Sequence, residues 1–189
     1  MDGDTMKKIL ITGNPDFGLA KGLAGVFPKA DFISSSTGCD LEYKANMEAV
    51  AKRAIDYDVF VNNSALWNFK QTLLLELVWK EAEMAKKSLH IVCIGSTTDR
   101  ATKGSSWIYQ QEKKALRSYC NQLSLQSVWK EREVPRVSLI SFGTLENNAE
   151  KHPGRKCMSI VDAASYVKWI VEAPGNVNIN EISVDRLQR

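Results

Sequence analysis

Residues 9–20 read ILITGNPDFGLA, which is an apolar run, a turn containing Gly13 and Gly18, and the beginning of a helix with an apolar face. In a strand–turn–helix unit of this kind, glycine lets backbone N–H groups approach a phosphate at the helix N-terminus. The segment alone leaves two interpretations open, a phosphate-binding loop and a turn that merely needs glycine.

Outward from this unit, strand-like and helix-like segments alternate along the whole chain. The pattern predicts strands over 7–12, 30–35, 58–61, 89–95, 136–142 and 177–184, and helices over 18–27, 42–57, 69–87, 106–133 and 160–171. Such alternation indicates a parallel sheet covered on both faces. We therefore expect an α/β fold, a Rossmann-like doubly wound parallel sheet of about six or seven strands, in a single domain over residues 1–189.

Composition excludes several classes of protein. Hydrophobic residues make up 44% and charged residues 25% of the 189, which is ordinary for a globular domain. The net charge of +3 is too small to predict a nucleic-acid partner, and no apolar run is long enough to predict a membrane helix. The four cysteines and two histidines form no metal-ligand spacing, so we expect no metal. The polar N-terminus shows no signal peptide, which favours reduced thiols and a cytoplasmic location.

Tyr109 and Lys113 form the strongest chemical signal in the sequence. At positions i and i+4 of a predicted helix they share one face, and an ammonium near a phenol is expected to lower the tyrosine pKa. Ser96 follows a buried strand, at the end where parallel sheets bind ligands. A solvated helix face can also produce the Tyr–Lys spacing by itself, and Ser96 is what favours a catalytic interpretation.

Taken together, these motifs resemble those of the short-chain dehydrogenase/reductase family. The matching pieces are Thr12-Gly13 with Gly18, Asn62-Asn63-Ser64-Ala65, Ile94-Gly95-Ser96, Tyr109-x-x-x-Lys113, Phe142-Gly143-Thr144, and the VNIN element at 177–180. The resemblance covers nearly the whole chain. The Ser/Tyr/Lys set is its most specific part, and the glycine loop, whose spacing is one residue too long, is its least faithful.

The resemblance implies a catalytic role for four residues. Tyr109 would be the general acid that protonates a carbonyl oxygen, and Lys113 would lower its pKa and bind the nicotinamide ribose. Ser96 would hold the substrate oxygen, and Asn68 would position a water that links the lysine to solvent.

The resemblance also implies a nicotinamide dinucleotide cofactor. Its site residues would be Gly13, Asn14, Phe17, Gly18, Leu19, Ser34, Ser35, Asp40, Leu41, Asn63, Ser64, Ala65, Tyr109, Lys113, Gly143 and Thr144. The second strand ends in the hydroxyl run 34–37, with no carboxylate to repel a 2′-phosphate, which favours NADP over NAD. The alternative is that these serines form only a polar turn.

The chain is shorter than typical members of that family, and three omissions can be located. The usual helix between the serine run and Asp40 is expected to be absent, as is the helix directly after the Asn-Asn motif. The polar segment 145–157 is short for a substrate lid, which predicts an open site or one completed by a partner subunit. Helices 69–87 and 106–133 are those that pair across subunits in many family members, so we expect a homo-oligomer, with Trp129 as the exposed contact.

The resulting functional prediction is an NAD(P)-dependent oxidoreductase that transfers hydride between a nicotinamide and a small carbonyl or alcohol substrate. One alternative is a catalytically inactive nucleotide-binding regulator or scaffold on the same fold. An epimerase or dehydratase would share the tyrosine and lysine but usually has a larger C-terminal substrate region, which this chain lacks.

Overall fold

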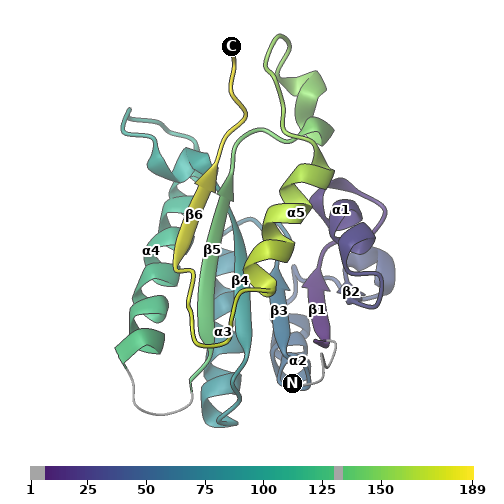
Figure 1. Ribbon diagram of the computed structural model, residues 1–189, viewed down its shortest axis with the longest axis vertical. Helices are drawn as coiled ribbons and strands as arrows, with labels where there is room; N and C mark the ends of the chain where they lie inside the picture. The colour runs from purple at the N-terminus through teal and green to yellow at the C-terminus, as the bar shows by residue number, and fades with distance from the viewer. Residues whose placement is uncertain (1–6, 130–133) are drawn as a thin grey trace.

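The computed structural model describes residues 7–129 and 134–189 and contains one parallel sheet between two layers of helices (Figure 1). Its strands are β1 (Ile9–Thr12), β2 (Asp31–Ile33), β3 (Val59–Asn62), β4 (His90–Ser96), β5 (Arg136–Phe142) and β6 (Glu181–Val184). Its α-helices are α1 (Gly18–Val26), α2 (Lys44–Ala54), α3 (Lys70–Met84), α4 (Ile108–Trp129) and α5 (Ile160–Val171). Three 3-10 turns, η1 (Ser35–Thr37), η2 (Thr97–Arg100) and η3 (Glu146–Lys151), complete the order.

The strands lie in the order β2-β1-β3-β4-β5-β6, and every neighbouring pair is parallel. The predicted doubly wound α/β sheet of six or seven strands is therefore confirmed with six. The order reverses between β1 and β3, and in open sheets of this kind a crevice forms at such a point beyond the carboxyl ends of the strands.

Each face of the sheet has its own hydrophobic core. Helices α2, α3 and α4 cover one face, where Phe60, Leu74 and Leu116 are fully or almost fully buried. Helices α1 and α5 cover the other face, over Ile11, Val92 and Ile140. Because the central strands are buried on both faces, their sequences are nearly continuous apolar runs instead of alternating ones.

Three of the predicted strands are shorter than expected: the strand over 7–12 begins at Ile9, that over 30–35 ends at Ile33, and that over 177–184 begins at Glu181. Side-chain hydrogen bonds explain the two larger changes. Ser34 leaves the predicted 30–35 strand, because its backbone N–H donates to Thr37 Oγ1 at 2.8 Å and begins η1. The start of the predicted 177–184 strand is replaced by a loop in which Asn178 Nδ2 donates to Val137 O at 3.2 Å. The end of the predicted 106–133 helix, residues 130–133, lies outside the described residues.

Two of the expected shortenings relative to the family are seen around the sheet. Only η1 and a short turn separate β2 from Asp40, and β2 is an edge strand of the sheet. The segment 145–157 folds as η3 and a return loop, closed by a bridge between Leu145 and Met158.

Candidate active site

The carboxyl ends of β1 and β3 are joined by a compact hydrogen-bond network at the reversal point of the sheet. Thr12 Oγ1 accepts from the backbone N–H groups of Asn63 and Ser64, at 2.9 and 3.0 Å. Asn63 Nδ2 donates in return to Thr12 O at 2.9 Å. The predicted Asn63-Ser64 segment is thus fixed directly beside the glycine turn.

The turn between β1 and α1 contains two glycines with positive φ. Gly13 has φ +133°, a conformation that favours glycine, and a Cβ there would lie 2.5 Å from Asn63 Nδ2. No side chain caps the N-terminus of α1, and no acidic residue occupies its first turn. Gly18, with φ +54°, opens that helix and lies close to the Asn147 side chain of η3. An uncapped helix N-terminus beside glycines suits an anionic group, so these residues fit a dinucleotide pyrophosphate.

Ser96 and Tyr109 meet at the carboxyl end of β4, near the middle of the sheet. Ser96 is the last residue of β4, and Tyr109 lies in the first turn of α4. Burial raises the pKa of the Tyr109 phenol above its ordinary value of 10.0, and a hydrogen bond with the Ser96 side chain acts in the opposite direction. The expected lowering of this pKa by Lys113 is therefore wrong for this arrangement.

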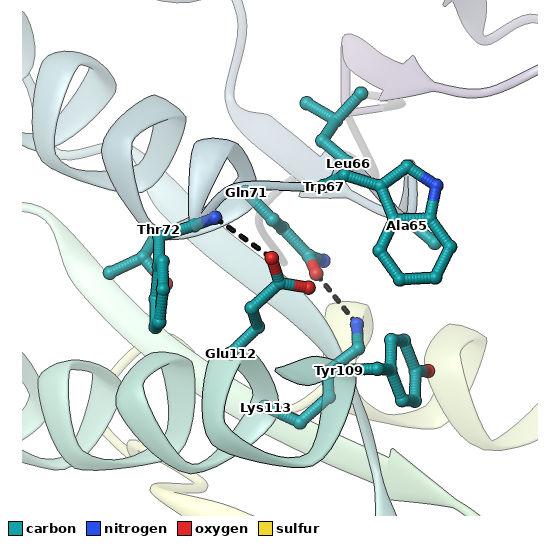
Figure 2. A pocket seen from close by; sticks show the side chains of 9 residues that line it. Ala65, Leu66, Trp67, Gln71, Thr72, Tyr109, Glu112 and Lys113 are labelled. Carbon is teal, nitrogen blue, oxygen red and sulfur yellow. Dashed lines mark hydrogen bonds between the residues drawn. The ribbon is translucent and has the colours of Figure 1, made fainter. Parts of the chain in front are cut away.

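Lys113 is almost completely buried and points into the protein instead of toward the phenolic oxygen. Its Nζ donates to Gln71 Oε1 at 2.6 Å and to Ile94 O at 3.2 Å, and it lies 5.4 Å from the centroid of the Tyr109 ring (Figure 2). Burial lowers the pKa of Lys113 from 10.5 to about 8. The ammonium thus lies beneath the phenol, on the same face of α4, as the i, i+4 spacing predicts.

Gln71 holds the lysine in place and was not anticipated from the sequence. Its Oε1 accepts from Lys113, while its Nε2 donates to Asn62 O at 2.9 Å and to Ile94 O at 3.0 Å. Only 4% of the residue is exposed. One buried amide therefore ties the ends of β3 and β4 to Lys113. A polar residue on the otherwise apolar inner face of a predicted helix was the signal that could have found it.

Asn68, in contrast, is exposed and adopts φ +57°. The structure does not bring it to the polar contacts of Lys113, and its expected role in positioning a water is supported by none of the described contacts. Sequence spacing selected Asn68, whereas the chain turn at Asn68 and Phe69 brings Gln71 to the site.

Glu112 is a second buried polar group that sequence reasoning missed. It is 6% exposed, and its Oε1 accepts from the backbone N–H of Phe69 at 3.2 Å. Because Phe69 is the N-cap residue of α3, this carboxylate fixes the loop that leads from β3 into the helix. A cavity of about 20 Å³, large enough for a single water, lies between this loop and α4. Its lining includes Ala65, one of the predicted cofactor residues, with Trp67, Tyr109 and Lys113.

The remaining predicted cofactor residues lie around the same edge of the sheet. Ser34 is buried at the end of β2 and Ser35 is exposed, while the Ser34 and Ser36 hydroxyls share a hydrogen bond of 2.6 Å. Asp40 Oδ1 accepts from the backbone of Glu42, which fixes the turn before α2.

Six of the predicted cofactor residues have packing or hydrogen-bonding roles in the described contacts. Leu41 is 4% exposed and belongs to the hydrophobic core beneath α2. Phe17, at the start of α1, is 64% exposed, and Asn14 O accepts from its backbone N–H. Gly143 N donates to Val184 O, and the Thr144 hydroxyl accepts from Arg155. Leu19 is buried in the first turn of α1.

Residues 7–129 and 134–189 contain no group of three or more His, Cys, Asp or Glu residues able to hold a metal ion. No helix among them is long and apolar enough to cross a membrane.

No family model matches the sequence, and no curated protein is found as a relative. Solved structures are similar in fold. Serine dehydrogenase from Escherichia coli aligns over 93% of this chain and 96% of its own, with 18% identity and a TM-score of 0.68. ElxO with NADP bound aligns over 95% and 98%, with 14% identity and a TM-score of 0.72. A short-chain dehydrogenase/reductase from Vibrio parahaemolyticus aligns over 95% and 99%, with 20% identity and a TM-score of 0.70. The chain therefore has the Rossmann-like fold of the short-chain dehydrogenases/reductases.

Proposed function

We propose that the protein is an NADP-dependent oxidoreductase that interconverts a small carbonyl compound and its alcohol. The observation that carries the proposal is that Ser96, at the carboxyl end of β4, lies near Tyr109 and opposes the rise that burial causes in the pKa of its phenol, while the Lys113 ammonium lies 5.4 Å from the centroid of the phenol ring. A hydroxyl pair beside a buried cation can hold a carbonyl oxygen and deliver a proton to it.

The reaction is written here in the direction of reduction. A reduced nicotinamide bound at this site would supply the hydride to the carbonyl carbon and would itself be oxidised. The Tyr109 O–H donates its proton to the carbonyl oxygen, which gives the alcohol, and the phenol regains a proton from solvent. Ser96 donates a hydrogen bond to the same oxygen and stabilises the charge that develops there.

Lys113 lies 5.4 Å from the centroid of the Tyr109 ring, with its ammonium directed at Gln71 Oε1 and Ile94 O. Gln71 takes the positioning role that the family resemblance assigned to Asn68, because Gln71 is the side chain that contacts the lysine. A third N–H of Lys113 is left for a ribose hydroxyl, since two are directed at Gln71 Oε1 and Ile94 O.

NADP is the proposed cofactor, with NAD as the alternative. Hydroxyls at the end of β2 can donate to a 2′-phosphate, and the Asp40 carboxylate is engaged with the backbone of the next turn. The structures of ElxO and of serine dehydrogenase in complex with NADP+, which share the fold, support this preference. The pyrophosphate would lie at Gly13 and Gly18, over the uncapped end of α1.

A second candidate is a protein that binds the dinucleotide without turning over a substrate. It is favoured by the direction of the Lys113 ammonium, toward Gln71 and away from the phenol, and by the raised pKa of Tyr109. Cofactor binding without any oxidation of NADPH in a broad panel of carbonyl compounds would favour this candidate.

The single domain, the oligomer and the cytoplasmic location remain proposals. Exposed apolar residues at the ends of the two long helices support the proposed homo-oligomer, since Met84 of α3 is 70% exposed and Trp129 of α4 is 80% exposed. The four free cysteines support a reducing compartment.

Cofactor binding and proton transfer can be tested separately. Titration with NADPH and NADH, followed by nicotinamide fluorescence, should show binding with a preference for NADPH, and binding of neither would refute the proposal. Tyr109→Phe should abolish turnover while leaving NADPH affinity within about threefold, because only the proton donor is removed. Turnover at the wild-type rate in this variant would exclude Tyr109 as the acid.

A further inference from the structure

Two exposed tryptophans flank the candidate proton donor. Trp67 lies in the loop after β3 and Trp107 lies just before α4, so two distant segments of the chain supply them. The Trp67 ring meets the Tyr109 ring edge to face, with centroids 6.1 Å apart and planes at 61°. The Trp107 ring lies tilted against the same phenol, with centroids 4.9 Å apart. Figure 2 shows Trp67 facing Tyr109 across the mouth of the pocket.

Neither indole is used to fill the core. Trp67 is 53% exposed and Trp107 is 54% exposed, although both touch Tyr109. Trp79 of α3, by comparison, is 3% exposed. An exposed aromatic surface of this kind next to a reactive hydroxyl has the character of a ligand-binding surface, because isolated exposed apolar residues do not gather around one side chain by chance.

The charged side chains of the adjoining pocket are already engaged. Glu112 accepts from the Phe69 backbone, and Lys113 donates to Gln71 and Ile94 O. These groups therefore do not present a free charge to an ionic substituent of a substrate. The indoles of Trp67 and Trp107, in contrast, are each more than half exposed while both contact the Tyr109 ring.

We propose that the substrate of this site is an aryl aldehyde or ketone, or the matching benzylic alcohol, whose ring packs against Trp67 and Trp107. This inference rests on the proposed function. A carbonyl oxygen at the Tyr109 hydroxyl places the attached group within reach of both indoles, since both rings contact that phenol. The chemistry is the one given above: the carbonyl carbon gains a hydride from the reduced nicotinamide and the oxygen gains the Tyr109 proton.

A matched pair of ketones tests the inference. Acetophenone and cyclohexyl methyl ketone have the same carbon skeleton and differ in the aromaticity of the ring. Because their intrinsic reactivities differ, the quantity to compare is the ratio of their kcat/KM values across variants. Trp67→Ala combined with Trp107→Ala should lower the aryl-to-cyclohexyl ratio about tenfold, the amount expected from losing aromatic contacts. Trp67→Phe with Trp107→Phe should keep most of the preference, and Trp169→Ala, an exposed tryptophan on α5, should leave the ratio unchanged. An unchanged ratio in the double alanine variant would overturn the inference.

A binding measurement separates this inference from the proposed function. Acetophenone should bind the protein with saturating NADP+ about tenfold more tightly than cyclohexyl methyl ketone in calorimetry, and the double alanine variant should lose that difference. Turnover of both ketones without an aryl preference would support the proposed oxidoreductase function and refute the proposed aryl substrate class. Aryl-selective binding without turnover supports the substrate class and refutes the oxidoreductase. If the double alanine variant changes only the oligomeric state in light scattering, the surface is a contact between copies and the inference fails.

Discussion

Replacement of Lys113 by methionine should change how stability depends on pH, in a direction fixed by the buried ammonium. Burial lowers the pKa of Lys113 from 10.5 to about 8. Between these two values the unfolded chain binds this proton and the folded protein does not. The free energy of unfolding must therefore rise with pH across that window, relative to a protein without the lysine.

The size of the effect follows from the two pKa values. A shift of about 2.5 pKa units corresponds to about 3 kcal/mol of destabilisation by Lys113 at pH values below the window. Most of the change falls inside the accessible range. Between about pH 7 and about pH 9.5, the free energy of unfolding of the wild type minus that of Lys113→Met should rise by about 2 kcal/mol.

Urea denaturation of both proteins at several pH values measures this difference directly. Tyrosines, cysteines and other groups that titrate in both proteins largely cancel when the two curves are subtracted. Lys113→Leu serves as a second variant, because its constant offset can differ but its pH slope must be the same. A difference that stays flat, or that falls as pH rises, would mean that the ammonium is not desolvated as the structure shows.

Three further perturbations test other parts of the structure. Gln71→Leu removes the acceptor of Lys113 and two donated hydrogen bonds, so the free energy of unfolding should fall by about 3 kcal/mol in urea denaturation. As a control, Gln111→Leu on the exposed face of α4 should change it by less than about 0.5 kcal/mol. Equal losses in the two variants would refute the role of Gln71. Burial lowers the pKa of His90 from 6.5 to about 3. As the pH falls from about 6.5 to about 3, the free energy of unfolding of the wild type should therefore decrease by up to about 1.4 kcal/mol per pH unit relative to that of His90→Gln. The same pH dependence of unfolding in both proteins would contradict this. Ser159→Ala removes the hydroxyl that accepts from Asp162 N at the start of α5, and should cost about 1 kcal/mol in thermal denaturation; no loss would show that the cap contributes nothing.

The strand and helix pattern of this sheet could be predicted because double-sided burial forces long apolar runs. Strand β4 is buried over six of its seven residues, and its sequence HIVCIGS shows this directly. The ends of elements could not be predicted in the same way. The Thr37 hydroxyl accepts from the Ser34 N–H just after β2, and Asn178 Nδ2 donates to Val137 O before β6 begins. A local sequence pattern does not show which backbone group such a side chain contacts.

The residues of the candidate site also differ in whether a local sequence pattern can predict them. Tyr109 and Lys113 were predicted because helical geometry alone places i and i+4 together. Gln71 depends on contacts with Asn62, Ile94 and Lys113, which only the folded sheet brings together. The direction of the Lys113 ammonium also depends on the folded sheet. The sequence predicts that it faces the phenol, whereas in the structure it donates to the buried amide of Gln71.

The edge position of β2 has a consequence for how this chain behaves among copies of itself. A free sheet edge is a template on which another extended segment can add by backbone hydrogen bonding. Here that edge is only three residues long and begins with the exposed Asp31, whose carboxylate accepts from the Tyr57 hydroxyl at 2.7 Å and lies near Arg53. A short edge strand that carries a fixed charge is a poor template for pairing. We therefore expect that the shortened sheet does not promote fibrous association through β2.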